Sequence, residues 1–169
     1  MRRVLAVLVE NEPGVLARIA GLFSGRNYNI ESISASPTQD PGTTHITITT
    51  VGDSVIFEQI VKQLRKLICV VKVIDFTDIP AVMRSLLFIK VHTDEAKRGD
   101  VLRIAEIFRC KVIDISLSDL TLEVTGDHSK LQAIIQLLQN FGIKEMAFGG
   151  TVAMRRSMQG NLHEEGEKG

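Results

Sequence analysis

The residues best suited to chemistry in this sequence stand in the short segment Asn11-Glu12-Pro13-Gly14, directly before an apolar helical pattern. The first turn of a helix leaves backbone N–H groups without partners and carries a positive field, so it can hold a small carboxylate. Gly14 leaves the backbone open to close approach, and the Asn11 amide can both donate and accept hydrogen bonds. The same segment also fits an ordinary helix start, with Asn11 as the cap and Pro13 in the first turn. Spacing alone leaves both interpretations open.

Motifs for covalent, acid–base or metal chemistry are missing from the sequence. The four histidines, at positions 45, 92, 128 and 163, have no metal-ligand spacing. There is no Cys-x-x-Cys pair, no phosphate-binding loop of the G-x-x-x-x-G-K-[ST] type and no Gly-x-Ser-x-Gly motif. Cys69 and Cys110 stand in separate apolar segments, and we expect buried free thiols there. A small enzyme would need a polar catalytic cluster, and none is visible in the sequence. We therefore expect a binding protein without catalytic residues, metal or cofactor.

The elements that would position the turn follow from hydrophobic periodicity. Residues 4–9 are a continuous apolar run, which predicts a buried strand ahead of the turn. Apolar residues then recur with helical spacing from Val15 to Phe23, and Arg26-Asn27 ends this helix because Asn tolerates the left-handed backbone conformation. The next expected elements are a strand at 28–36, a hairpin loop at 37–43, an alternating strand at 45–49, a helix from 52–54 to 68 and a strand at 70–76.

The same order of elements returns in the second part of the chain. Its expected strands are 86–91, 111–118, 120–125 and either 143–148 or 151–154, with helices around 101–108 and 131–138. The predicted fold class is therefore α+β, with two tandem ferredoxin-like βαββαβ domains. The boundaries that we expect are 1–78 for the first domain, 79–84 for a linker, 85–156 for the second domain and 157–169 for a disordered tail.

The composition argues against nucleic acid and membranes as partners. Twenty basic and 20 acidic residues give a formal net charge of zero, whereas both partners call for clustered positive charge. An RNA-recognition domain has the same order of elements but carries aromatic and basic side chains on its central strands, which here read Val4-Leu5-Ala6-Val7 and His45-Ile46-Thr47-Ile48. No segment approaches the ~18–20 apolar residues of a membrane helix. We expect a cytoplasmic protein.

Two blocks around the turn carry a specific resemblance. They run from Arg3 to Ile19 and from Leu22 to Ile33, and both resemble the regulatory (small) subunits of acetohydroxyacid synthase, also called acetolactate synthase. These are ACT-domain proteins, so the first domain is identified as an ACT domain and the second as ACT-like. The likeness resumes at Phe108–Asp114, Thr125–Asp127 and Phe141–Glu145.

The resemblance implies a homodimer whose ACT domains pair through the strand at 28–36 into one continuous sheet. A branched-chain amino acid, most often valine, would bind at that interface, with Asn29 reaching in from the partner subunit. The residues that the resemblance places around this ligand are Asn11, Gly14, Val15, Leu16, Asn29 and Ile30.

The resemblance also implies a role in branched-chain amino acid biosynthesis. Such a subunit raises the activity of a catalytic large subunit and makes it sensitive to feedback inhibition. The thiamine diphosphate, magnesium and FAD of that enzyme would belong to the catalytic subunit, and none of them to this chain.

Overall fold

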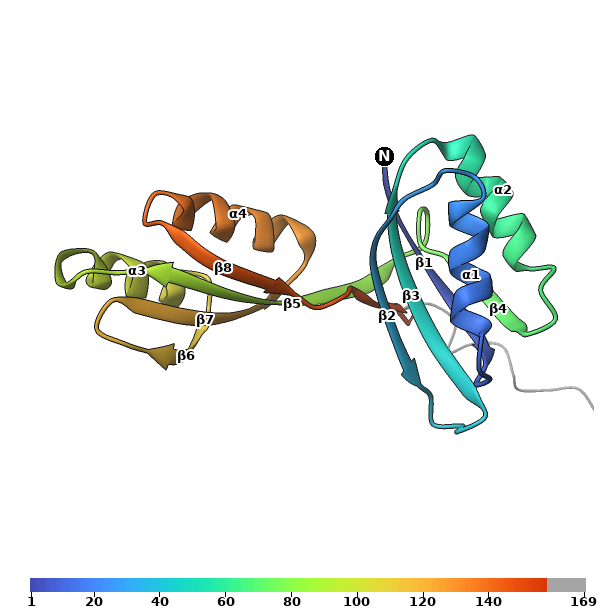
Figure 1. The fold of residues 1–169 in the computed structure, drawn as a ribbon, viewed down its shortest axis with the longest axis horizontal. Helices are drawn as coiled ribbons and strands as arrows, with labels where there is room; N and C mark the ends of the chain where they lie inside the picture. The colour runs from blue at the N-terminus through green and yellow to red at the C-terminus, as the bar shows by residue number, and fades with distance from the viewer. Residues whose placement is uncertain (158–169) are drawn as a thin grey trace, which may run out of the picture.

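Each half of the chain folds into an antiparallel sheet with two helices on one face (Figure 1). The computed structural model describes residues 1–157, so the expected disordered tail lies outside the described residues except for its first position. Both halves follow the predicted βαββαβ order, which confirms the predicted α+β fold class. None of the helices within residues 1–157 is long and apolar enough to span a membrane.

The N-terminal unit is a sheet with the strand order β2-β3-β1-β4, so β2 lies at an edge, as expected. Its elements are β1 (Arg2–Glu10), α1 (Val15–Ser24), β2 (Ile30–Pro37), β3 (Thr43–Val51), α2 (Ser54–Leu64) and β4 (Val70–Asp75). Strand alternation directs Leu5, Val7 and Val9 to one face, where they belong to the same buried cluster as Ile19 of α1 and Phe57 of α2. None of the helices in residues 1–157 covers the opposite face of this sheet (Figure 1).

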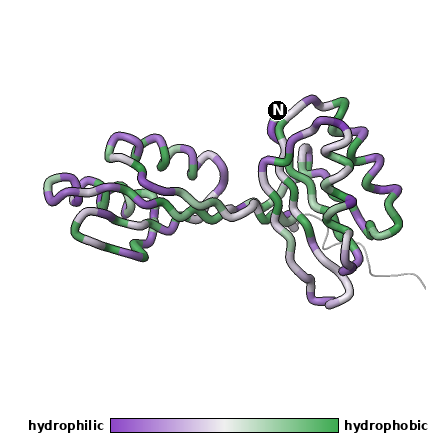
Figure 2. The backbone as a smooth tube through the Cα atoms, viewed as in Figure 1, coloured by the Kyte–Doolittle hydropathy of each residue, from purple (hydrophilic) through white to green (hydrophobic). Residues whose placement is uncertain are grey.

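The C-terminal unit repeats this plan with the strand order β6-β7-β5-β8. Its elements are β5 (Ala81–His92), α3 (Glu95–Ile107), β6 (Lys111–Ile115), β7 (Asp119–Gly126), α4 (His128–Gln139), β8 (Ile143–Phe148) and β9 (Val152–Arg155). Leu87, Ile89 and Val91 of β5 are buried in one cluster with Leu122 and Leu138. In Figure 2, hydrophobic residues run along the sheets, while loops and the outer sides of the helices are mainly hydrophilic.

The segment expected to be a linker, residues 79–84, is mostly strand. Residues 81–84 form the first part of β5 and pair with all of β9, from Ala81 opposite Arg155 to Arg84 opposite Val152. No pattern in the sequence indicated this pairing, because the hydrogen bonds that order the segment come from a strand at the far end of the described chain. Both positions offered for a last strand are strands, β8 and β9.

The ribbon of β5 and β9 joins the two units by covering the open face of the N-terminal sheet. Ala81 and Met83 of β5 and Ala153 of β9 pack in one cluster with Val4 and Ala6 of β1. The small alanine side chains on both sides allow the ribbon to approach the sheet closely. The two units therefore share a third, smaller core between them.

The two units approach each other closely at Gly150, just before β9. A Cβ atom at this position would lie 2.5 Å from the carbonyl oxygen of Ile33 and 3.0 Å from the Cβ of Ser34, both in β2. We predict that Gly150→Ala lowers the free energy of unfolding by about 1–3 kcal/mol, the usual cost of overpacking. Denaturant unfolding of the purified chain measures this loss.

Gly149→Ala is the matched control for this prediction. Its added Cβ would meet the Cβ of Leu86 at 3.4 Å, which is an ordinary van der Waals contact. We expect Gly149→Ala to leave the free energy of unfolding nearly unchanged. An equal loss in both variants would mean that the contact of Gly150 with β2 does not limit the packing of the two units.

Candidate functional site

The predicted ligand turn connects β1 to α1 at one end of the N-terminal sheet. Strand β1 ends at Glu10 and α1 begins at Val15, so residues 11–14 form the whole connection. The backbone N–H of Asn11 donates to the carbonyl oxygen of Gly42 at 2.8 Å, which ties the turn to the loop between β2 and β3. The turn is thus fixed by the sheet on one side and by a neighbouring hairpin on the other.

Asn11 does not cap the helix, so this part of the sequence prediction was wrong. The cap position is Gly14, and no side chain accepts a hydrogen bond there. The Asn11 amide donates instead to the carbonyl oxygen of Pro41 at 3.1 Å, and its side-chain oxygen accepts from Thr44 Oγ1 at 3.1 Å. These hairpin partners were missed because nothing in the local pattern around Pro41 and Thr44 points to residue 11. The exposed side chain keeps one amide hydrogen and one oxygen lone pair for a ligand.

A glycine is needed at position 14 because of the backbone conformation there, and not because neighbouring atoms leave no room for a side chain. Its φ is +85°, in the region that favours glycine, and a Cβ added to it would meet nothing within 4 Å. The helix start is therefore open to a small molecule. This openness fits the binding interpretation of the turn as well as the structural one.

The first turn of α1 presents polar backbone groups beside an apolar side chain. The N–H of Val15 reaches the carbonyl oxygen of Glu12 only at 3.5 Å, at the limit of a hydrogen bond. The N–H of Leu16 has no partner inside the helix, because it belongs to the first turn. The Val15 side chain is buried in the core, whereas that of Leu16 is 46% exposed. This arrangement suits a carboxylate with an attached apolar group.

Asn29 and Ile30 lie at the other end of α1 from the turn. The helix has 10 residues and is therefore about 15 Å long. Asn29 is exposed, its carbonyl oxygen accepts from Thr50 Oγ1 at 2.5 Å, and Ile30 is the first residue of β2. Within one chain the structure thus brings together the first four predicted site residues, Asn11, Gly14, Val15 and Leu16, and keeps the other two apart from them.

The position of Asn29 is set by the chain reversal after α1. Asn27 has a φ of +53°, so the predicted left-handed conformation at the helix end is confirmed. Tyr28 is then buried in the core, and its hydroxyl donates to the carbonyl oxygen of Asp53 at 3.1 Å. Burial raises the pKa of Tyr28 above its ordinary value. The buried ring anchors the start of β2 and leaves the next side chain, Asn29, outside.

Clusters of metal-binding side chains do not occur in the described part of the chain. No group of three or more His, Cys, Asp or Glu side chains within residues 1–157 is arranged to hold a metal ion. Cys69 is buried, Cys110 is partly buried, and both are free thiols.

Comparisons with known proteins match both units of the chain. The family model described as "AHAS small subunit-like ACT domain" matches residues 5–72, and the one described as "Small subunit of acetolactate synthase" matches residues 84–157. The acetolactate synthase small subunit of Aquifex aeolicus is 53% identical over 158 residues, covering 93% of this chain and 82% of that protein. The probable acetolactate synthase small subunit of Archaeoglobus fulgidus is 46% identical, covering 92% of this chain and 98% of that protein.

A solved structure agrees with these relatives. The crystal structure of the acetolactate synthase small subunit from Thermotoga maritima superposes with a TM-score of 0.81 at 38% sequence identity. The match covers 94% of this chain and 99% of that chain. The likeness therefore extends over both units and their arrangement.

The backbone conformation at Gly14 can be tested independently of any ligand. We predict that Gly14→Ala lowers the free energy of unfolding by about 1–2 kcal/mol, the cost of placing an L-residue in the left-handed region. Gly14→Asn should cost less, because Asn tolerates that region better than Ala. Denaturant unfolding of both variants checks the order. A loss for Asn as large as that for Ala would contradict the backbone explanation.

Proposed function

Because this chain belongs to the family of acetolactate synthase small subunits, we propose that it is the non-catalytic regulatory subunit of that enzyme. In this role it binds a branched-chain amino acid, with valine as the first candidate, raises the activity of a catalytic large subunit and makes it sensitive to feedback inhibition. The large subunit holds thiamine diphosphate, magnesium and FAD. The observation that carries the proposal is the open start of α1 at Gly14.

The polar end of an amino acid matches the groups at this helix start. Its carboxylate would accept hydrogen bonds from the N–H groups of Val15 and Leu16, in the positive field of the helix. Its ammonium group would donate to the free lone pair of the Asn11 side-chain oxygen. A branched aliphatic side chain would lie against the exposed part of Leu16.

A homodimer through β2 would complete the site with Asn29 of the second subunit. Strand β2 is an edge strand, and pairing it with its own copy would satisfy its open hydrogen bonds. In an antiparallel pair, the start of one β2 at Ile30 lies beside the end of the other at Pro37. Pro37 leads directly into the hairpin loop that holds Asn11. Asn29 of one subunit would therefore lie near the ligand turn of the other.

A ligand held by two subunits gives a physical route to regulation. It binds only when both subunits are in one arrangement, and therefore stabilises that arrangement over others. The catalytic large subunit would respond to the population of this arrangement. Typical allosteric couplings of this kind amount to ~1–3 kcal/mol.

Titration of the full chain with valine, leucine and isoleucine by calorimetry tests the site. We predict binding of at least one of the three, with a difference of about 1–3 kcal/mol between valine and the two larger ligands, which each have one methylene group more. Gly14→Asp should weaken binding at least tenfold, because its carboxylate would repel that of the ligand (~1.4 kcal/mol per tenfold). Gly14→Asn is the matched control, with a similar shape and no charge. Equal binding by wild type and Gly14→Asp would rule out this helix start as the site.

Mixed dimers test whether each site is shared between subunits. Chains carrying Gly14→Asp and chains carrying Asn29→Ala should each lose binding as homodimers. A dimer with one chain of each kind has both defects in one site and none in the other, so we predict that it recovers half of the wild-type sites. Co-purification with two different affinity tags isolates this mixed dimer for calorimetry. No recovery would mean that Gly14 and Asn29 act within one chain.

A further inference from the structure

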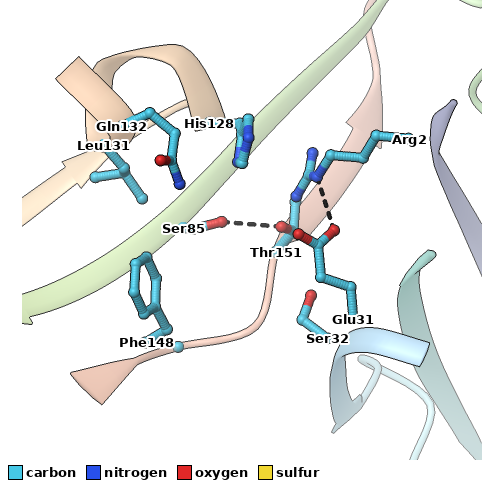
Figure 3. Close-up of a pocket in the computed structure, with 10 residues that line it drawn as sticks. Arg2, Glu31, Ser32, Ser85, His128, Leu131, Gln132, Phe148 and Thr151 are labelled. Atoms are coloured by element: carbon cyan, nitrogen blue, oxygen red, sulfur yellow. Dashed lines mark hydrogen bonds and ion pairs between the residues drawn. The ribbon is translucent and has the colours of Figure 1, made fainter. Parts of the chain in front are cut away.

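A cavity of about 270 Å³ lies between the two units, away from the turn at Gly14. Arg2 of β1 and Glu31 and Ser32 of β2 form one wall, and Leu131 of α4 and Phe148 of β8 form the other (Figure 3). Its volume is just below the ~300–1,000 Å³ of pockets for drug-sized ligands. The cavity therefore suits a small metabolite.

The N-terminal wall carries one positive and one negative group side by side. Arg2 Nε and Glu31 Oε2 are 2.9 Å apart, and the two side chains are 27% and 41% exposed. This bond uses Nε of the guanidinium, so the two terminal nitrogens of Arg2 can donate to a further acceptor. The second carboxylate oxygen of Glu31 can likewise accept from a further donor. A carboxylate and an ammonium group on one small molecule would fit these two places.

The C-terminal wall carries the apolar side chains Leu131 and Phe148 beside the polar side chains His128 and Gln132. Leu131 is buried beneath the cavity, and the ring of Phe148 remains 54% exposed although it lies on the helix side of the sheet. Between the walls, Ser85 Oγ and Thr151 Oγ1 are hydrogen-bonded at 2.9 Å (Figure 3). An apolar group that filled the space would cover the exposed Phe148 ring.

The charges of the cavity discriminate between classes of ligand. A simple anion would be attracted by Arg2 and repelled by Glu31. The start of α4 offers an anion little more, since the Asp127 carboxylate already accepts from the N–H of Lys130 at 2.9 Å. A purely apolar ligand would remove water from the Arg2–Glu31 ion pair without offering it new hydrogen bonds. A zwitterion with an apolar side chain satisfies the charges and the opposite wall together.

We propose that this cavity is a second ligand site, which binds a free α-amino acid with an apolar side chain. The ligand carboxylate bonds to Arg2, its ammonium group bonds to Glu31, and its side chain packs against Phe148. This site lies within one chain and shares no residue with the site at Gly14. A ligand there contacts both units and favours one orientation between them.

Calorimetry on the full chain in the Gly14→Asp background tests the second site. Each proteinogenic L-amino acid is titrated in turn, and we expect at least one apolar amino acid to bind with one equivalent per chain. Adding Arg2→Met should weaken this binding roughly tenfold or more, because a charge-assisted hydrogen bond is lost. Arg103→Met is the matched control, since Arg103 pairs with Asp100 on the exposed surface of α3. Phe148→Ala removes the opposite wall at a half-exposed position and should also weaken binding.

Ligands that lack one charged group test the recognition of a zwitterion. Isovalerate has no ammonium group and isobutylamine has no carboxylate, so both should bind the Gly14→Asp chain at least roughly tenfold more weakly than the amino acid. The proposal is overturned if no amino acid binds the Gly14→Asp chain, or if Arg2→Met and Arg103→Met, both shown to fold by thermal melting, bind equally. Identical binding by wild type and Gly14→Asp would instead count against the first site and leave this one standing.

Discussion

Within residues 1–157, strand β2 is hydrogen-bonded on one side only, and most of the surface that we propose to be functional depends on this constraint. Its inner side pairs with β3 along its length, while the outer row of N–H and C=O groups is open. Such an edge invites a further strand unless it is covered or interrupted. Asn29 directly precedes this strand and Ile30 begins it, the next residues line the interdomain cavity, and its middle lies close to Gly150. One strand of eight residues thus lies at every place where we expect the chain to meet a ligand or another copy.

The ribbon of β5 and β9 packs on the open face of the N-terminal sheet, and within residues 1–157 β2 has no paired strand on its outer side. This is possible because the ribbon of β5 and β9 is narrow and presents small side chains, such as Ala153, to Ala6. The close approach at Gly150 then sets the distance between the C-terminal unit and β2. A larger residue there would separate the two units and open the cavity between them. The geometry of the cavity therefore depends on the same contact that joins the two halves.

The sequence allowed us to predict those features of the fold that depend on residues close together in the chain. Apolar periodicity identified the central strands and the helices of both units, and Asn27 indicated the left-handed turn that ends α1. The features that escaped prediction depend on residues far apart in the chain. The strand character of residues 81–84 comes from β9, and Asn11 bonds to a hairpin rather than to its own helix. Contacts of this kind leave no periodic pattern, so only the folded chain reveals them.

The arrangement of the two proposed sites suggests how one strand could connect them. Asn29 and Ile30 would face a ligand at the partner's helix start, and the next residue, Glu31, holds Arg2 in the cavity of its own chain. Successive side chains of a strand point to opposite faces, so Ile30 and Glu31 face different surroundings. Because both belong to β2, a small shift of this strand would move the groups at both proposed sites at once. Gly150 lies close to the backbone of Ile33 and the Cβ of Ser34, and a shift of β2 would therefore also displace the C-terminal unit. Packed interfaces of this kind change between discrete arrangements rather than deforming continuously. If the proposed dimer forms, ligand binding at the subunit interface and the orientation of the C-terminal unit would both depend on the position of β2.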